Sequence, residues 1–348
     1  MRTNRFLART RLAVRAVARA VSRRRWTRCG RLEVQREPRL GRDAEVLIRG
    51  DARHIPLRDG CVQCCVTSPP YWGLRDYGNP NQIGLEPTPN AYVANIVAVF
   101  SEVRRVLKDD GTLWLNIGDT FNNFRVSMNG QTVHNGEQRH KPEGRRKVDA
   151  LLKEKDLVGI PWRVAFALQA DGWYLRSDII WSKPNPMPES VTDRPTKAHE
   201  YLFLLAKSER YYYDADAIRE PFNCGEPRPM GNRVASAHGV TKLTGNMDPV
   251  RKLSSMNAAG RNRRSVWSVT TMPYAGAHFA TMPEKLVEPC ILAGCPIGSV
   301  VIDPFIGSGT VGAVAERLGR RWVGIDLSYQ DLAKKRTAQR GLLMEASA

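Results

Sequence analysis

The sequence is poor in acidic residues relative to basic ones, with 35 Asp and Glu against 53 Lys and Arg. The resulting net charge of +18 favours a polyanionic partner, for which nucleic acid is the usual choice. The chain also lacks an apolar run near the ~18 residues that a membrane-spanning helix requires, so we expect no membrane partner. Its 42% hydrophobic and 25% charged residues are typical of a globular protein and exclude a mainly disordered chain.

Cysteine is also scarce, and its arrangement excludes a disulfide-bonded scaffold. The seven cysteines are an odd number without framework spacing, which is typical of free thiols in a reducing compartment. Cys61, Cys64 and Cys65 lie close together, but no second pair of Cys or His residues stands at the spacing of a zinc site. We therefore expect a cytoplasmic protein that has no metal centre.

The positive charge is concentrated near the start of the chain, where residues 1–42 contain 14 Arg, no Lys and two acidic residues. This segment thus carries +12 of the net charge, and we expect it to be a disordered or helical basic arm. Three interpretations of the arm remain open. It can contact nucleic acid, it can be a dispensable extension that includes a start codon placed too early, or it can be an Arg-rich targeting peptide.

The rest of the chain alternates short apolar segments with amphipathic ones, which predicts strands and helices in alternation. Strands are expected at 45–49, 61–67, 112–117, 173–181, 201–205, 210–213, 299–303 and 321–326, and helices at 91–107, 161–170 and 310–318. Residues 108–111 are expected to form a turn, and 210–213 to pair with 201–205 as a hairpin. A strand–helix–strand order is the crossover unit of a parallel sheet. We therefore expect a Rossmann-like, doubly wound α/β fold with a mostly parallel sheet and an antiparallel hairpin strand.

A glycine-containing loop follows one buried strand and opens a helix. It runs from Asp303 to Thr310 with the sequence DPFIGSGT. Glycines allow the backbone to approach a ligand closely, and the helix amino terminus offers unpaired N–H groups. The next predicted strand ends in Asp326, where an acidic side chain can bind a ribose diol. Because the loop has one G-x-G and not three glycines, it favours a nucleoside cofactor without a pyrophosphate over NAD.

A second loop, Thr67-Ser68-Pro69-Pro70-Tyr71-Trp72, ends the strand predicted at 61–67. Its two prolines fix the backbone, so the neighbouring carbonyl groups become rigid acceptors. Ser68 adds a hydroxyl oxygen and Tyr71 adds a flat ring. Two acceptors beside a stacking ring can hold a planar heterocycle that bears an amino group. A proline-stiffened loop over a core aromatic residue is the plainer interpretation of the same sequence.

Together the two loops resemble the catalytic and cofactor motifs of the DNA amino-methyltransferases, which methylate the exocyclic amine of cytosine or adenine with S-adenosylmethionine. The catalytic loop comes first, which is the order of the family's beta group. Three further segments resemble the family in the expected order, namely Gly50-Asp51, Asp178 to Pro186 and His278 to Glu284. The resemblance spans roughly residues 45–335.

The resemblance implies a site-specific enzyme that takes a flipped base from double-stranded DNA, as in restriction–modification systems. Cytosine N4 is favoured over adenine N6, because Ser at the first position of the Pro-Pro motif goes mainly with cytosine in this family. The implied catalytic residues are Ser68, Pro69, Pro70 and Tyr71. The implied target-base pocket comprises Trp72, Trp181 and Lys183. The implied binding residues for S-adenosyl-L-methionine are Asp51, Thr281, Asp303, Phe305, Gly307, Ser308, Gly309, Thr310 and Asp326.

The resemblance also suggests the domain organisation. Residues 43–213 form the catalytic half with a mobile loop at 122–150, residues 214–264 form a target-recognition insertion, and residues 265–340 form the cofactor-binding half. Arginines within the insertion are expected to contact DNA, although a solvated charged face is the alternative. They are Arg228, Arg233, Arg251, Arg261, Arg263 and Arg264.

Other functions stay open at this point. The same fold can act on RNA or protein, and a basic protein can bind DNA without catalysis. His199, next to Glu200, is expected to form a structural hydrogen bond in preference to acting as a general base. Both a monomer and a dimer are compatible with the sequence.

Overall fold

The computed structural model describes residues 45–122, 152–153, 155–221, 260–271, 281–327 and 333, all within the unit Pro38–Ala348. The predicted arm at 1–42, nearly all of the loop at 122–150 and most of the insertion at 214–264 lie outside the described residues. Among the helices described, none combines the length and apolar character needed to cross a membrane.

An eight-stranded sheet forms the centre of the fold, in the order β1-β8-β7-β2-β3-β5-β4-β6. The strands are β1 (Glu45–Arg49), β2 (Val62–Thr67), β3 (Leu107–Ile117), β4 (Tyr174–Ser182), β5 (His199–Ala206), β6 (Val266–Ser268), β7 (Val300–Asp303) and β8 (Arg321–Asp326). The first five strands across the sheet are parallel, β5 is antiparallel to both of its neighbours, and β6 is parallel to β4. This confirms the predicted Rossmann-like α/β class with a mostly parallel sheet.

Both faces of the sheet are buried at its inner strands, whose successive residues point into two different hydrophobic cores. In β2, Cys65 packs into one hydrophobic core, whereas Cys64 and Val66 pack into the other. In the neighbouring β7, Ile302 joins the first core and Val301 the second. The continuous apolar runs in the sequence are therefore strands with two buried faces.

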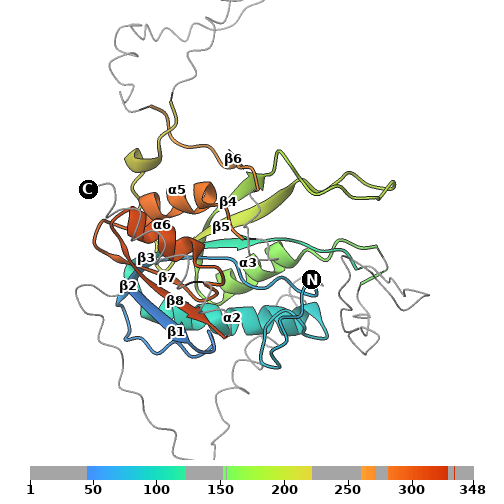
Figure 1. Ribbon diagram of the computed structural model, residues 1–348, viewed down its shortest axis with the longest axis horizontal. Helices are drawn as coiled ribbons and strands as arrows, with labels where there is room; N and C mark the ends of the chain where they lie inside the picture. Colours follow the sequence, from blue (N-terminus) through green and yellow to red (C-terminus); the bar gives the residue numbers. More distant parts are fainter. Residues whose placement is uncertain are drawn as a thin grey trace, which may run out of the picture. The chain divides into compact units, whose positions relative to one another are not determined.

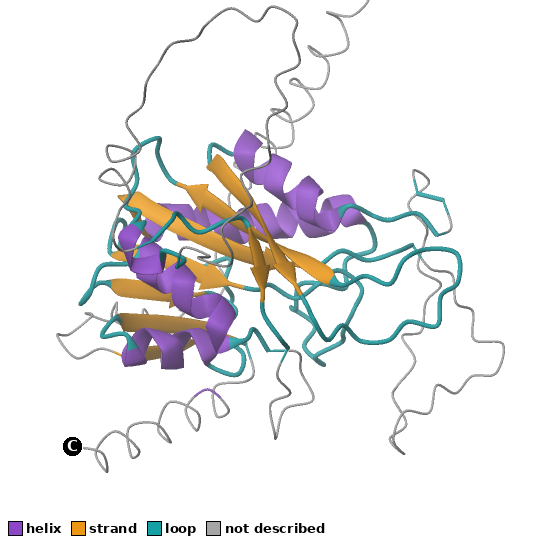
Figure 2. Cartoon of the chain, turned by 90° about the horizontal axis from the view of Figure 1, so that it is seen from above, coloured by secondary structure: helices purple, strands orange, loops and turns teal. Residues whose placement is uncertain are grey.

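Helices cover the two faces of the sheet and complete a three-layer arrangement (Figure 1, Figure 2). The first core is covered by α2 (Pro89–Val106) and α3 (Ile160–Ala170), and the second by α5 (Glu284–Gly294) and α6 (Thr310–Arg317). A short 3-10 helix, η1, spans Asp216–Ile218. Thr88 precedes α2 and caps it, because its hydroxyl group accepts a hydrogen bond from the Ala91 N–H. Capping of this kind fixes where the helix starts.

The prediction of a turn at 108–111 is wrong, because these residues belong to β3. The chain passes directly from α2 into that strand. The pairing of β3 with β2 shifts register beside Val62, so 108–111 bulge out of the ladder. Gly111 suits the bulge, since a Cβ atom there would lie 2.9 Å from a backbone carbonyl oxygen.

The predicted strand at 210–213 is also wrong, because these residues form no strand. Both edges of β5 are already occupied by β3 and β4, which leaves no free edge for a further partner. The antiparallel hairpin is therefore β4–β5. Tyr213 instead packs through its ring, which stacks on Trp114 at a centroid distance of 6.4 Å.

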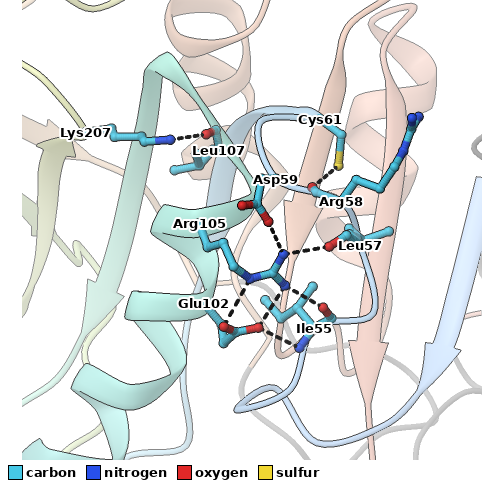
Figure 3. Close-up of polar contacts among 9 residues, drawn as sticks. All are labelled: Ile55, Leu57, Arg58, Asp59, Cys61, Glu102, Arg105, Leu107 and Lys207. Atoms are coloured by element: carbon cyan, nitrogen blue, oxygen red, sulfur yellow. Dashed lines mark hydrogen bonds and ion pairs between the residues drawn. The ribbon is translucent and has the colours of Figure 1, made fainter. Parts of the chain in front are cut away.

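Arg105, in the last turn of α2, holds the segment between β1 and β2 in place (Figure 3). Its Nη1 atom donates to the Leu57 carbonyl at 2.8 Å and to Asp59, and its Nη2 atom donates to the Ile55 carbonyl at 2.8 Å. Glu102, one turn earlier, accepts from the Nε and Nη2 atoms of the same guanidinium. One planar group thus serves two carbonyls and two carboxylates, which a lysine ammonium cannot do.

We expect Arg105→Met to lower the free energy of unfolding by about 2 kcal/mol, because two backbone carbonyls and Glu102 each lose the hydrogen bonds that Arg105 donates. Arg105→Lys should recover only part of this loss. Arg58→Met is the matched control, since Arg58 is exposed and points away from the network (Figure 3), and should change stability by less than about 0.5 kcal/mol. Urea-induced unfolding measures all three, and equal stability of Arg105→Met and Arg58→Met would contradict the assignment.

Candidate functional site

The ends of five neighbouring strands meet at one edge of the sheet. Since β1, β8, β7, β2 and β3 are parallel, their carboxyl ends share this edge, where α/β proteins bind their ligands. Across the edge stand, in spatial order, Asp51, Asp326, Asp303, Ser68 and Gly118. The fold thus brings together the two loops that the sequence identified 235 positions apart, counted from Ser68 to Asp303.

A buried hydrogen bond joins these two loops directly. The Thr67 hydroxyl donates to Asp303 Oδ1 at 2.6 Å, and the same oxygen accepts from the Phe305 N–H at 3.0 Å. Asp303 is only 3% exposed. Burial raises the pKa of Asp303 to about 7, although the two hydrogen bonds act in the opposite direction. The carboxyl group therefore changes charge near neutral pH.

The backbone of the loop at 303–310 leaves an open cradle beside an acidic side chain. Gly307 and Gly309 have φ angles of +47° and +81°, in the region that favours glycine. The nearest described atom to a Cβ added at Gly307 would be the Phe305 carbonyl oxygen at 3.8 Å. Asp326 Oδ2 accepts a hydrogen bond from the Gly307 N–H at 3.1 Å. Open space next to a carboxylate fits the sugar of a nucleoside.

The prolines of the other loop are braced by neighbouring residues. The Tyr92 hydroxyl, from α2, donates to the Pro70 carbonyl at 2.9 Å. Gly84, at φ +111°, lies against Pro70, and its carbonyl accepts from the Gly73 N–H at 2.6 Å. The Pro70 carbonyl thus serves to hold the loop, and the loop is fixed at the point where the sequence predicted rigid acceptors.

Tyr71 is held by two side chains that sequence analysis did not identify. Its ring lies so close to Gly118 that a Cβ atom there would be 2.6 Å from the ring. Its hydroxyl group donates to Glu200 Oε2 at 2.5 Å and lies 3.2 Å from Asn116 Oδ1. Lys183 Nζ contacts the other oxygen of Glu200 at 2.5 Å. Burial and the adjacent Glu200 raise the pKa of Tyr71 well above its usual value.

The signal that could have revealed Glu200 is the pairing of β5 with β3. Asn116 lies opposite Leu202, so Glu200, two residues away on the same face, is its diagonal neighbour. That relation needs the strand order, which the sequence does not contain. His199, the neighbour that the sequence drew attention to, packs edge-on to Tyr201 at a centroid distance of 5.5 Å.

The tryptophans assigned to the target-base pocket both lie in the core. Trp72 is 7% exposed and donates from its indole N–H to the Glu86 carbonyl. Trp181 is 3% exposed and donates to the Val269 carbonyl, with Lys183 Nζ 4.4 Å from its ring centre. Lys183, the third expected pocket residue, contacts Glu200, which also binds the Tyr71 hydroxyl. The pocket itself stays a prediction.

Two further residues expected to bind the cofactor have defined places. Asp51 pairs with Arg53, whose Nε and Nη2 atoms lie 3.0 and 2.6 Å from its carboxylate oxygens. It follows Gly50, whose N–H donates to the Asp326 carbonyl and so brings this turn next to β8. Thr281 is partly buried just before α5.

Of the arginines expected to contact DNA, Arg228, Arg233 and Arg251 lie outside the described residues. The other three are engaged within the protein. Arg261 and Arg264 form ion pairs with Glu220 at 3.4 and 3.2 Å, and the Arg263 guanidinium lies 4.5 Å from the ring centre of Trp267. Arg264 keeps 67% of its side chain exposed, so a second partner can still reach it.

A cavity of about 610 Å³ lies at the opposite edge of the sheet and does not belong to this site. Its lining residues are Asp59, Gly60, Ser101, Arg104, Arg105, Asp109, Asp171 and Lys207. They stand at the amino-terminal ends of β2 and β3 and at the carboxyl ends of α2, α3 and β5. The lining includes no residue of the loops at 67–72 and 303–310, so this cavity is separate from the candidate site.

Comparisons with known proteins agree with this geometry. A family model described as DNA methylase matches residues 62–335. Type II methyltransferase M.Cfr9I of Citrobacter freundii is 47% identical over 313 residues, which cover 87% of this chain and 91% of that protein. Type II methyltransferase M.SmaI of Serratia marcescens is 47% identical over 301 residues, which cover 84% and 91%.

Two solved structures share the fold. The PvuII DNA methyltransferase (cytosine-N4-specific) aligns with a TM-score of 0.54 and 19% identity over 83% of this chain and 85% of that one. TTHA0409 of Thermus thermophilus, in complex with S-adenosyl-L-methionine, aligns with a TM-score of 0.52 and 23% identity over 85% and 94%. At these identities the likeness concerns the arrangement of the sheet and its helices.

The buried carboxyl group of Asp303 predicts a pH dependence of stability. Folding raises its pKa from 3.8 to about 7. As pH rises from about 4 to 7, the unfolded chain therefore loses this proton while the folded protein keeps it, and the free energy of unfolding falls. Asp303→Asn keeps the acceptor oxygen but cannot ionise, and should gain roughly 3 kcal/mol relative to the wild type between pH 4.5 and pH 8. Urea unfolding at the two pH values measures the difference, and a pH-independent difference between the two proteins would refute the shifted pKa.

Proposed function

The chain belongs to this family of DNA methylases and is a DNA methyltransferase, and on that premise we propose that it transfers the methyl group of S-adenosylmethionine to the N4 atom of cytosine in double-stranded DNA. The observation that carries the proposal is the hydrogen bond between Thr67 and Asp303. It sets the Ser68-Pro69-Pro70-Tyr71 loop beside the glycine loop, so a base held by the first and a cofactor held by the second are neighbours.

The residues at the ends of β7 and β8 fit the cofactor. The space at Gly307 allows close approach of its backbone, and the Asp326 carboxylate is placed to bind the ribose diol. Asp51 lies next to Asp326 through the Gly50 contact and is assigned to the adenine end. Phe305, Ser308, Gly309, Thr310 and Thr281 complete the proposed binding set. S-adenosylmethionine supplies the electrophilic methyl group when it is bound.

The residues after β2 hold and activate the target amine. An amino group conjugated to a heterocyclic ring is a weak nucleophile, because its lone pair is delocalised. Hydrogen bonds from its two N–H groups to Ser68 and to the Pro69 carbonyl localise the lone pair on nitrogen and orient it for attack. The braced loop keeps these acceptors in place before the base arrives, which is the source of the rate enhancement.

The target base must leave the duplex to reach this edge of the sheet. Tyr71 offers a ring for it to stack on, and Trp72, Trp181 and Lys183 are the proposed walls of its pocket. Contacts to the DNA backbone and to neighbouring bases are assigned to the basic insertion at 214–264, which includes Arg261, Arg263 and Arg264.

Cytosine N4 is proposed over adenine N6 on the identity of one residue. Ser68 occupies the first position of the motif, and in this family Ser goes mainly with cytosine. Adenine N6 is the alternative, and the identity of the methylated base separates the two.

We expect wild-type protein and labelled S-adenosylmethionine to place label in duplex DNA, and digestion to nucleosides to yield N4-methylcytosine. N6-methyladenine as the product would reverse the choice of base and keep the enzyme class. Ser68→Ala removes one acceptor for the amine and should lower the methylation rate by ~10²-fold or more. Binding of S-adenosylmethionine, measured by calorimetry, should be unchanged in this variant.

The cofactor assignment gives a separate expectation. Asp326→Asn removes the charge proposed to bind the ribose diol, and should weaken S-adenosylmethionine binding by ~10-fold or more. Glu288→Gln, on the outer side of α5 and 40% exposed, is the matched control and should bind as the wild type does. Isothermal titration calorimetry measures both, and equal affinity of the two variants would exclude Asp326 from the binding site.

A further inference from the structure

A largely buried carboxylate on β5 is bonded by groups from three other parts of the fold. Glu200 Oε2 accepts a hydrogen bond from the Tyr71 hydroxyl at 2.5 Å and another from Asn116 Nδ2 at 3.1 Å. Glu200 Oε1 lies 2.5 Å from Lys183 Nζ, and the two side chains of this ion pair are 15% and 19% exposed. The loop at 67–72, β3 and the residue that follows β4 thus meet at one side chain of β5.

The Tyr71 ring is held both against the backbone and at its hydroxyl group. A Cβ atom added at Gly118 would lie 2.6 Å from the ring atom Cε2, so the ring rests on a part of β3's following turn where only glycine leaves room for it. The hydroxyl group donates to Glu200 and lies 3.2 Å from Asn116 Oδ1. Contacts at these two places define where the ring lies and how its plane is turned.

The two acceptors of this hydroxyl group are themselves fixed. Asn116 is 1% exposed, and its Nδ2 atom donates to the Tyr201 carbonyl at 3.2 Å as well as to Glu200, which directs its Oδ1 atom toward Tyr71. Lys183 supplies the countercharge that a carboxylate out of water requires. The Lys183 N–H also donates to the Ala198 carbonyl at 2.8 Å, which keeps this lysine beside β5.

The proline loop alone does not determine the orientation of the Tyr71 ring. The hydrogen bond from Tyr92 to the Pro70 carbonyl braces the backbone, but a tyrosine side chain still rotates about two bonds beyond the backbone. A ring that turns freely cannot hold a stacked base with its amine in line with the methyl group. Phenylalanine would offer the same ring, so the hydroxyl group and its acceptors add a tether and not stacking area.

We propose that Glu200 is a positioning residue for methyl transfer, which together with Asn116 holds the Tyr71 hydroxyl and so fixes the ring on which the flipped base stacks. Lys183 acts through Glu200 as its countercharge. This inference rests on the proposed function and deepens it, since it explains how the ring assigned to the base is oriented before the base arrives. Glu200 touches neither base nor cofactor in this arrangement and acts through Tyr71.

The test is a double-mutant cycle on the single-turnover rate of methyl transfer, with S-adenosylmethionine and duplex DNA bound in advance. Tyr71→Phe keeps the ring and removes the tethered hydroxyl, and Glu200→Ala removes its acceptor. We expect each variant to lose ~10-fold or more in this rate, because the ring loses its fixed orientation. The double variant should stay within about twofold of Tyr71→Phe, because Glu200 has no hydroxyl group left to hold.

Two controls accompany the cycle. Glu288→Gln on α5 removes a carboxylate that is 40% exposed and distant in sequence from the cluster, and should keep the wild-type rate. Binding of S-adenosylmethionine, measured by calorimetry, should stay within about twofold of the wild type in every variant, because neither Tyr71 nor Glu200 is assigned to the cofactor.

The cycle separates positioning from a merely structural role. A residue that only stabilises the fold would slow the wild type and Tyr71→Phe by the same factor, whereas a residue that acts through the hydroxyl slows the wild type alone. Thermal unfolding of each variant checks the fold. If Glu200→Ala does not fold, Glu200→Asp takes its place in the same cycle with the same expected rates, since it keeps the charge for Lys183 but draws the carboxylate back from Tyr71 by one methylene group.

A wild-type rate in Tyr71→Phe would overturn the proposal, as would a Glu200 substitution that slows Tyr71→Phe by the same factor as the wild type. Failure of the proposed function is distinct, because in that case the wild-type protein itself methylates no duplex DNA.

Discussion

The hydrogen bond from Thr67 to Asp303 is the contact on which the arrangement of the site depends. It is made between the last residues of β2 and β7, two parallel strands that lie side by side in the sheet. Because both groups are buried, the bond has no water to compete with it. Breaking it would leave the Thr67 hydroxyl without this acceptor and Asp303 with one donor fewer in the core. The loop proposed to hold the base and the loop proposed to hold the cofactor are thereby fixed at one distance from each other.

At this edge of the sheet, a residue proposed to serve the chemistry lowers the stability of the fold. Burial of Asp303 raises its pKa and costs stability near neutral pH. At the opposite edge, Arg105 satisfies two backbone carbonyls and two carboxylates with one guanidinium group. The costly burial of a carboxyl group thus occurs at the proposed site of the chemistry, while the stabilising contacts of Arg105 lie at the far ends of the strands.

The predictions from sequence were most accurate where local rules determine the structure. The loop at 303–310 follows a buried strand and opens α6, and Gly307 and Gly309 adopt the positive φ angles that glycine permits. The paired prolines end β2 as expected. The prediction failed at 210–213, because both edges of β5, the strand that this run of tyrosines was expected to join, are occupied by β3 and β4. The turn at 108–111 became a bulge, because β2 continues to pair with β3 on both sides of it.

The sequence by itself determined the α/β class, the two loops and the family, because strand periodicity, proline stiffness and glycine freedom are properties of neighbouring residues. Only the tertiary structure decided which distant side chains meet. Glu200 reaches Tyr71 because β5 runs antiparallel to β3, and Lys183 reaches Glu200 because β4 returns beside β5. Strand order depends on the packing of the whole sheet, and no segment of the chain encodes it alone.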